Sequence, residues 1–131
     1  MSALRDSPAV PCPFCSLAGT PLVYESERAV AFRDRYPVSN GHTLIIPRRH
    51  AVTYFDASAE EQAEIWRAVE VVKRDLDREL RPDGYNVGFN AGEAAGQTVM
   101  HLHVHVIPRF RGDMADPRGG VRGVIPDKQR Y

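Results

Sequence analysis

The chain has 131 residues, with 17 lysines and arginines against 17 aspartates and glutamates, so its formal net charge is zero. This balance gives no bulk electrostatic reason to expect DNA, RNA or an anionic membrane as partner. No apolar run approaches the roughly 20 residues needed to span a bilayer, and the first residues lack the apolar core of a signal peptide. We therefore expect one domain acting in the cytoplasm, with no nucleic acid and no membrane as partner.

The two cysteines form a C-x-x-C motif, Cys12 and Cys15, after a segment of residues 1–11 that we expect to be flexible. In a reducing compartment a structural disulfide between them is not expected. A lone C-x-x-C is compatible with a redox pair, with half of a zinc site, or with chance. Prolines flank Cys12 and no strand–motif–helix unit surrounds it, which disfavours the redox pair. A zinc site needs two further ligands from elsewhere in the chain.

Five short strands are predicted along the chain. Alternating patterns between turn residues predict a hairpin from residues 22–26 and 29–34, and a third strand at 42–50. Two more strands are predicted at residues 84–90 and 101–108.

One helix is predicted between the third and fourth strands. Ser58 with Glu61 forms a capping box, and Pro82 ends the helical pattern. Between them apolar residues recur at three- and four-residue steps: Ile65, Val69, Val72, Leu76 and Leu80. Hairpins combined with one long helix indicate an antiparallel α+β domain.

Three of the five histidines occupy alternate positions of the last predicted strand: His101, His103 and His105. Alternate residues of a strand share a face, so the imidazoles are expected on one side and the intervening apolar residues in the core. The outer two would be roughly 13 Å apart at Cα, too far for all three rings to ligate one zinc easily at about 2 Å. A solvated polar face is a poor explanation for three histidines. We infer that one end of the row serves a metal and the rest serves chemistry.

A glycine-bearing loop leads into these histidines and carries Gln97 and Thr98. Such a loop can direct backbone N–H groups and side-chain donors at phosphate oxygens. A neutral imidazole can attack phosphorus and divide one displacement into two. Loop and imidazoles together indicate a phosphate-handling site.

The stretch GQTVMHLHVHVIPR resembles the signature of the histidine triad (HIT) family, in which three histidines alternate with apolar residues and two apolar residues follow. The stretches AFRDRYPVSNGHTLIIPRRH and GYNVGFNAGEAAGQT resemble the blocks upstream of it, and the similarity covers residues 12–109, which we take as the domain. The resemblance implies an HIT-like fold, a five-stranded antiparallel sheet with one long helix, paired into a ten-stranded sheet in a homodimer.

Carried over by position, the resemblance implies that His103 is the nucleophile. His105 would bind the phosphate oxygens or the leaving side, His42 would join from the third strand, and Gln97 and Thr98 would hold the phosphate. The other implied nucleotide-binding residues are Asn90 near the phosphate, Asp34 at the ribose hydroxyls, and Phe14 and Phe32 at the base. Ordinary core packing of the two phenylalanines, and a solvated turn at Asp34, stay open as alternatives.

Bacterial-type members with an N-terminal C-x-x-C hold a zinc ion, and the matching positions here are Cys12, Cys15, His50 and His101. Four such ligands close a tetrahedral shell, so the zinc would be structural. His101 would then be absent from direct catalysis, although its backbone carbonyl can orient the His103 ring by accepting from Nδ1.

The resemblance implies a nucleotide hydrolase or transferase that acts at the α-phosphate of dinucleoside polyphosphates, such as diadenosine tetraphosphate, through a nucleotidyl-histidine. A purine nucleoside phosphoramidase is the close alternative, and the sequence VIPRF is weak support for the polyphosphate branch. A non-catalytic nucleotide-binding protein is disfavoured by the intact set of histidines. A zinc hydrolase with an open metal site is disfavoured by the two cysteines, which would close the shell.

The C-terminal tail, residues 110–131, is rich in glycine, arginine and proline and predicts no regular element. Arg118 and Arg122 suit a polyphosphate. A mobile, solvated tail and a tail that crosses to a partner subunit are equally compatible with this composition.

Overall fold

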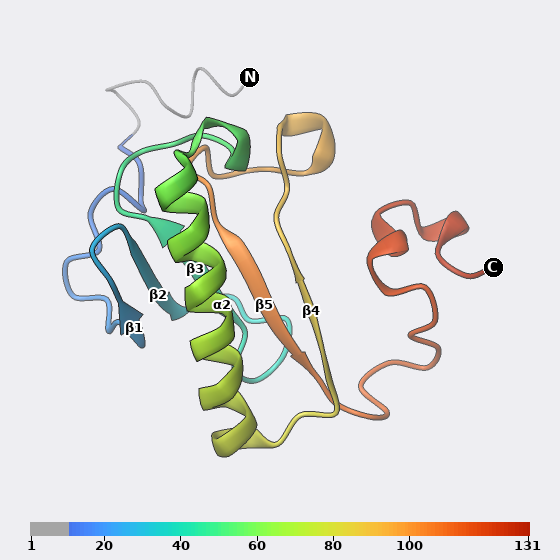
Figure 1. Ribbon diagram of the computed structural model, residues 1–131. Coiled ribbons are helices and arrows are strands. Elements are labelled where there is room, and N and C mark those ends of the chain that lie inside the picture. Colours follow the sequence, from blue (N-terminus) through green and yellow to red (C-terminus); the bar gives the residue numbers. More distant parts are fainter. Residues whose placement is uncertain (1–10) are drawn as a thin grey trace.

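A computed structural model describes residues 11–131 of the chain (Figure 1). Within this part, one five-stranded sheet has the order β1-β2-β3-β5-β4 and every neighbouring pair is antiparallel. One long helix, α2 (Ala59–Leu80), crosses the sheet. The predicted fold class is therefore confirmed. The predicted flexible segment, residues 1–11, lies outside the described residues except for Pro11.

The strands lie close to their predicted positions, although β1 is shorter than predicted. They are β1 (Tyr24–Glu25), β2 (Ala29–Arg33), β3 (Thr43–Pro47), β4 (Gly84–Gly88) and β5 (Val104–Arg109). Short 3₁₀ helices are η1 (Tyr54–Asp56), η2 (Glu93–Ala95), η3 (Gly120–Val124) and η4 (Pro126–Lys128).

The last strand begins later than predicted, so His101 and His103 precede it and His105 alone lies within it. The backbone of residues 101–103 pairs outside the sheet, because Leu102 N donates to the Ala51 carbonyl at 2.7 Å. The expected burial is nevertheless present, since Leu102 and Val104 have no exposed surface. The expectation of one continuous strand through all three histidines is therefore wrong.

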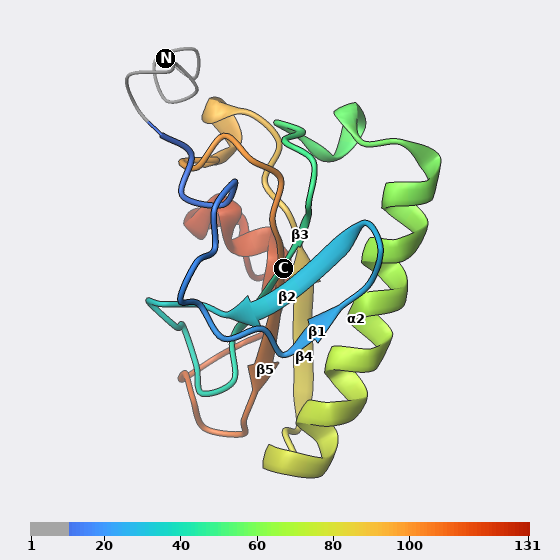
Figure 2. The ribbon, with the colours of Figure 1, turned by 90° about the vertical axis from the view of Figure 1, so that its left-hand side faces the viewer.

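The sheet has two apolar faces because successive residues of a strand point to opposite sides. Under α2 lies the main core, which includes Ala31, Ile45 and Val104. On the opposite face, Phe32 and Leu44 belong to a second cluster of strand residues. That cluster packs against side chains of the N-terminal segment, which lies across the sheet from α2 (Figure 2).

Helix α2 (Ala59–Leu80) begins at the predicted capping box. Glu61 N donates to Ser58 Oγ at 3.1 Å, and Ser58 N donates to Glu61 Oε1 at 2.7 Å. The helix ends at Arg81, whose φ of 50° is left-handed, directly before Pro82. Start and end are therefore both set by local chemistry readable in the sequence.

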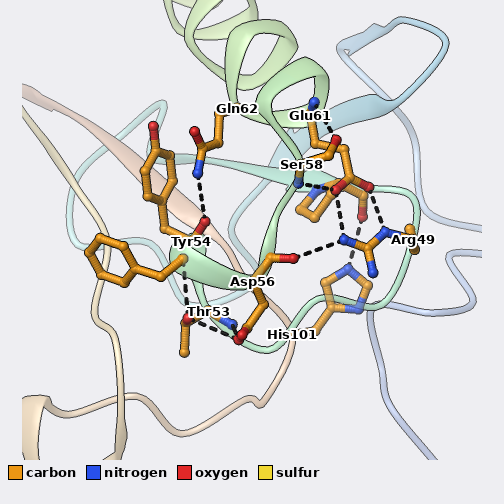
Figure 3. Close-up of polar contacts among 10 residues, drawn as sticks. Arg49, Thr53, Tyr54, Asp56, Ser58, Glu61, Gln62 and His101 are labelled. Atoms are coloured by element: carbon orange, nitrogen blue, oxygen red, sulfur yellow. Dashed lines mark hydrogen bonds and ion pairs between the residues drawn. The ribbon is translucent and has the colours of Figure 1, made fainter.

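The same Glu61 carboxylate joins the helix to the chain that follows β3 (Figure 3). Arg49 donates to both of its oxygens, at 3.0 Å and 2.8 Å. The Arg49 guanidinium, with help from the Ser58 donors, lowers the pKa of the buried Glu61 to about 2. This pair fixes the backbone next to His50 against the first turn of α2.

We expect Glu61→Ala to lower the free energy of unfolding by about 2 kcal/mol, because it removes both a helix cap and a charge-assisted pair. Glu60→Ala, at an exposed position in the same turn, is the matched control and should cost far less. The contribution is complete above the ordinary glutamate pKa and is lost as the pH falls toward 2. Urea denaturation at neutral pH measures both variants, and equal losses would contradict this role.

The C-terminal tail, residues 110–131, lies beside β4 (Figure 1). It contains the two short 3₁₀ helices η3 and η4, although the sequence predicted no regular element there. Arg122 donates to the carbonyls of Lys128 at 2.9 Å and Gln129 at 3.3 Å, which closes η3 and η4 into one small unit. Gly119 is required here, since its φ is 92° and a Cβ would collide with the Gln129 carbonyl. The Arg122 guanidinium is thus engaged within the tail.

Candidate functional site

Four metal-ligand side chains converge where the N-terminal segment meets the end of the sheet. Ligand atoms of Cys12, Cys15, His50 and His101 all lie within 4.8 Å of one another. Cys12 Sγ is 3.4 Å from His101 Nδ1, and Cys15 Sγ is 3.1 Å from His50 Nδ1. The two cysteines form no disulfide. The four predicted ligands are therefore brought together from three separate parts of the chain.

This donor set fits zinc. Tetrahedral Zn–S and Zn–N bonds place neighbouring sulfur and nitrogen atoms about 3.5 Å apart, close to the observed separations. His101 is fully buried, and its Nε2 lies 2.9 Å from the Pro47 carbonyl. A carbonyl only accepts, so Nε2 carries the proton and Nδ1 presents its lone pair to the cysteines. A closed shell of this kind leaves no position for a reacting water, so the metal would supply structure.

A backbone carbonyl also sets the orientation of the His103 ring. His103 Nδ1 lies 2.9 Å from the His101 carbonyl, the hydrogen bond expected from the sequence. Nδ1 is therefore the protonated nitrogen, and Nε2 keeps a free lone pair. The ring is half-buried, which leaves that lone pair available for attack on phosphorus.

His42 and His105 are joined by a hydrogen bond whose direction follows from their other partners. Val38 N–H donates to His42 Nδ1 at 3.0 Å, so the proton of His42 is on Nε2. That Nε2 lies 3.0 Å from His105 Nδ1 and 3.4 Å from Asp34 Oδ2. His105 Nδ1 accepts, which leaves its Nε2–H as a donor for an anionic oxygen. His103 Nε2 thus offers a lone pair, whereas His105 Nε2 offers a proton.

The atoms of Asp34, His42 and His105 also lie within 4.8 Å of one another, close enough to hold a metal ion. The hydrogen-bond pattern opposes this use. The Val38 N–H already takes the Nδ1 lone pair of His42, and its Nε2 carries a proton. We assign this group to hydrogen bonding.

Burial keeps this pair of histidines neutral. Burial, more than repulsion by His103, lowers the pKa of His105 to about 4. Burial also lowers the pKa of His42, against the opposing pull of Asp34. Both rings are therefore uncharged at neutral pH, which the hydrogen-bond pattern requires.

This predicts acid sensitivity of the fold. An unfolded histidine titrates near pH 6.5. Between about pH 6.5 and pH 4, residue 105 is therefore protonated in the unfolded chain but neutral in the folded protein. The free energy of unfolding should fall as the pH falls through this interval. His105→Gln should have a shallower decline, measured by denaturation at pH 7 and pH 5. The wild type and His105→Gln both keep the metal-ligand group, so the titration of that group cancels in the comparison. An identical fall in the free energy of unfolding in the two proteins would contradict the neutral state assigned to His105.

The predicted base and ribose residues lie on the same side of the sheet as the histidines. The Phe14 ring is edge-on to Phe32 at 5.5 Å and to His103 at 5.3 Å between centroids. Asp34 Oδ1 accepts from Tyr36 N at 3.0 Å and its other oxygen faces His42. Their roles toward a nucleotide stay predictions. The open alternatives are partly realised, because Phe32 is buried with the strand cluster.

The Gln97 side chain is engaged with the backbone. It is buried, accepts from Gly92 N at 2.8 Å, and donates to the carbonyls of Val52 at 2.6 Å and Val99 at 3.1 Å. It therefore holds the loop in shape, and direct binding of phosphate by this amide stays a prediction. Thr98 is exposed beside it.

A cavity of about 350 Å³ lies beside two of the predicted site histidines. His42, His105 and Asn90 line it together with apolar side chains, among them Ile107 and, from the tail, Val121 and Val124. Among the described residues, no lysine or arginine lines it. The tail thus contributes to the surroundings of the site, a contribution that its composition did not reveal.

Sequence reasoning also missed the backbone groups of Val38 and Pro47, which set the tautomers of His42 and His101. Every residue but proline carries the same N–H donor, and every residue carries the same carbonyl. No residue type could therefore have identified these two positions in advance.

Fold and site together define a class: an α+β protein with a histidine oriented by a backbone carbonyl, a neutral histidine pair and a Cys₂His₂ group on one sheet. The HIT domain family model matches residues 18–112. The chain belongs to the histidine triad family.

Relatives of known structure share this architecture. A hypothetical histidine triad nucleotide-binding protein from Sulfolobus tokodaii strain7 is 40% identical with a TM-score of 0.73, over 80% of this chain and 73% of that chain. A zinc-bound histidine triad family protein from Mycobacterium smegmatis is 35% identical with a TM-score of 0.74, over 82% and 81%. The bis(5'-nucleosyl)-tetraphosphatase (asymmetrical) of Schizosaccharomyces pombe is 32% identical over 98 residues, 75% of this chain and 54% of that protein.

In residues 11–131 no helix is both long enough and apolar enough to cross a membrane.

Proposed function

We propose that the protein hydrolyses nucleotide conjugates at the α-phosphate, through a nucleotidyl intermediate on His103. The observation that carries this is the hydrogen bond from His103 Nδ1–H to the His101 carbonyl at 2.9 Å, which leaves Nε2 as a lone pair. The ring is half-buried, so part of its surface stays accessible. Such preorganisation is what nucleophilic catalysis requires.

In the first step His103 Nε2 bonds to phosphorus, and the bond from phosphorus to the leaving atom breaks with its electron pair. His105 Nε2–H donates to a non-bridging oxygen as negative charge gathers there, and His42 holds that ring in the donating tautomer. In the second step a water oxygen bonds to phosphorus, and the bond from phosphorus to Nε2 breaks with its electron pair returning to Nε2. The attacking water loses a proton to solvent, and His103 is again a neutral imidazole. The product is a nucleoside monophosphate.

The remaining predicted residues bind the substrate in this proposal. Asn90 and Thr98 contact the phosphate, and Gln97 shapes their loop through its three backbone hydrogen bonds. Asp34 accepts from the ribose hydroxyls. Phe14 and Phe32, which lie edge-on to each other, border the base.

Dinucleoside polyphosphates are the first substrate class that we propose. The support is the similarity to the tetraphosphatase of S. pombe. Phosphoramidates are the second, because no cationic side chain of the described residues lines the cavity beside His105. A polyphosphate leaving group ordinarily meets lysine or arginine, whereas an amine does not need them. The two classes share the nucleophile and differ in the leaving group.

Structural zinc belongs to the same proposal. Cys12, Cys15, His50 and His101 would hold it as thiolates and neutral imidazoles, which suits the reducing cytoplasm that we expect. The zinc would fasten the N-terminal segment to the sheet.

A substrate panel tests the proposed function. Diadenosine polyphosphates and adenosine phosphoramidates are given to the purified protein, with and without Mg²⁺, and kcat/KM is compared. A rapid acid-free quench and peptide mass analysis should find the nucleotidyl group on His103. Absence of turnover on every member of the panel would sink the proposal.

We also predict a homodimer with a ten-stranded sheet. Strand β4 is an edge strand, and an edge presents unpaired backbone groups that favour pairing with a second copy. Val87 in β4 is partly exposed, as are Val121 and Val124 of the tail beside it, which gives the same side an apolar surface. Light scattering at micromolar concentration should give twice the chain mass. A monomer mass would remove the prediction.

A further inference from the structure

Phe14 lies next to both the metal-ligand group and His103, the proposed nucleophile. It lies between Cys12 and Cys15 in the C-x-x-C motif. Its ring is edge-on to the nucleophile His103, with centroids 5.3 Å apart, and to the metal-ligand residue His101, at 6.0 Å. One side chain therefore contacts a residue of each site.

The N-terminal segment is held to the sheet by side chains. Within residues 11–20 the described backbone hydrogen bonds are local, from Cys15 N to Cys12 O at 3.3 Å and from Thr20 N to Leu17 O at 2.9 Å. The contacts that reach the sheet are those of the cysteine sulfurs and the packing of Phe14 and Leu17. The position of Phe14 therefore depends on what holds the two cysteines.

A metal bound by Cys12 and Cys15 would restrain Phe14 from both sides along the chain, since it is separated from each cysteine by at most one residue. Without a metal, the sulfur–imidazole contacts are weak hydrogen bonds, and the ring gains freedom to leave His103. The restrained ring closes one wall beside the nucleophile and borders the slot proposed for the base.

We propose that Phe14 couples the metal site to the nucleotide site, so that bound zinc raises the affinity for nucleotide and bound nucleotide raises the affinity for zinc. The inference rests on the nucleotide binding proposed above. Such coupling is reciprocal, and the same factor applies in both directions. Phe14 acts here as a positioning residue for His103 and the base.

The size of the coupling follows from the contact. An edge-to-face aromatic pair is worth enough to change an equilibrium roughly 2- to 10-fold. The coupling factor should fall in this range. It should vanish when the ring is removed, even if nucleotide is present at saturation.

The test measures the zinc dissociation constant of the intact protein by equilibrium competition with a chelator of known zinc affinity, with and without saturating adenosine monophosphate. In the wild type, nucleotide should lower this dissociation constant roughly 2- to 10-fold. In Phe14→Ala, nucleotide at its own saturating concentration should leave the dissociation constant unchanged. Calorimetry first establishes the nucleotide Kd of each protein, so that saturation is known.

Leu17→Ala is the matched control. Leu17 lies in the same segment and packs on the same strand cluster, but its side chain carries no aromatic ring. Its loss should weaken zinc binding in general while keeping the nucleotide effect. Phe14→Leu, which keeps apolar bulk, guards against a folding defect in the alanine variant and should show a reduced effect.

Two results would overturn the coupling: no nucleotide effect in the wild type, or an equal effect in the wild type and Phe14→Ala. If adenosine and guanosine monophosphates both fail to bind the zinc-loaded wild type, the proposed function fails together with the coupling. Nucleotide binding and turnover without any effect on zinc affinity would reject the coupling alone.

Discussion

His103→Ala should reduce kcat/KM by at least about 10³-fold, because it removes the atom that forms the bond to phosphorus. The neighbouring histidines cannot replace it: the Nδ1 atoms of both His42 and His105 accept hydrogen bonds in the present arrangement, and their Nε2 atoms carry protons. Steady-state hydrolysis of the best panel substrate measures the loss. Nucleotide binding and zinc content should stay close to those of the wild type, since His103 ligates no metal.

His105→Ala is the control for this change and should slow turnover less severely. It removes a donor to the phosphate, whose loss ordinarily costs about 10²- to 10³-fold, but it leaves the nucleophile in place. In the wild type, two displacements at the same phosphorus should cancel and retain its configuration. Full activity in His103→Ala, or net inversion at phosphorus, would show that this assignment is wrong.

Cys12→Ser and Cys15→Ser should each destabilise the protein by about 3 kcal/mol or more, and lower Tm by roughly 10 °C. Metal binding is coupled to folding, and the described backbone hydrogen bonds within residues 11–20 are local. The cysteines therefore carry much of the attachment of that segment. Thermal unfolding and metal analysis of protein purified without chelator measure the effect.

Ser16→Ala, at an exposed position next to Cys15, is the matched control and should change Tm little. The chemical step should suffer less than stability in the cysteine variants, because neither cysteine contacts the phosphate in the proposed mechanism. The structural role of the metal would be contradicted if the wild-type protein, purified without chelator, contained no zinc or carried a disulfide between Cys12 and Cys15.

Local signals made the secondary structure readable in advance. Helix α2 was predictable because a capping box, an apolar period and a proline all act within a few residues of one another. The roles of the triad residues and the set of four predicted zinc ligands came from the resemblance to the histidine triad family, because the C-x-x-C motif alone left several uses open. Side-chain identity and short-range spacing were sufficient for the helix, whereas the ligand set needed the family resemblance.

Tertiary structure alone decided the chemical state of the histidines. The spacing of His101, His103 and His105 suggested that one end of the row serves a metal and the rest serves chemistry. It predicted one continuous strand, yet His101 is fully buried beside the cysteines and only His105 lies within β5. Which nitrogen carries the proton is set by the Pro47 carbonyl in His101 and by the Val38 N–H in His42. These backbone groups are common to almost every residue, so no pattern of letters marks them.

The surroundings of the site were equally inaccessible to sequence reasoning. Gln97 was expected at the phosphate, but folding surrounds its amide with backbone partners from Val52 and Gly92. Val121 and Val124 of the tail reach the cavity beside His105, although nothing local predicts where a tail will lie. The sequence by itself determined the residue types that can do chemistry and the elements that carry them. Their protonation, burial and neighbours were decided by contacts between residues far apart in the chain, because only the folded backbone brings those groups within hydrogen-bonding distance.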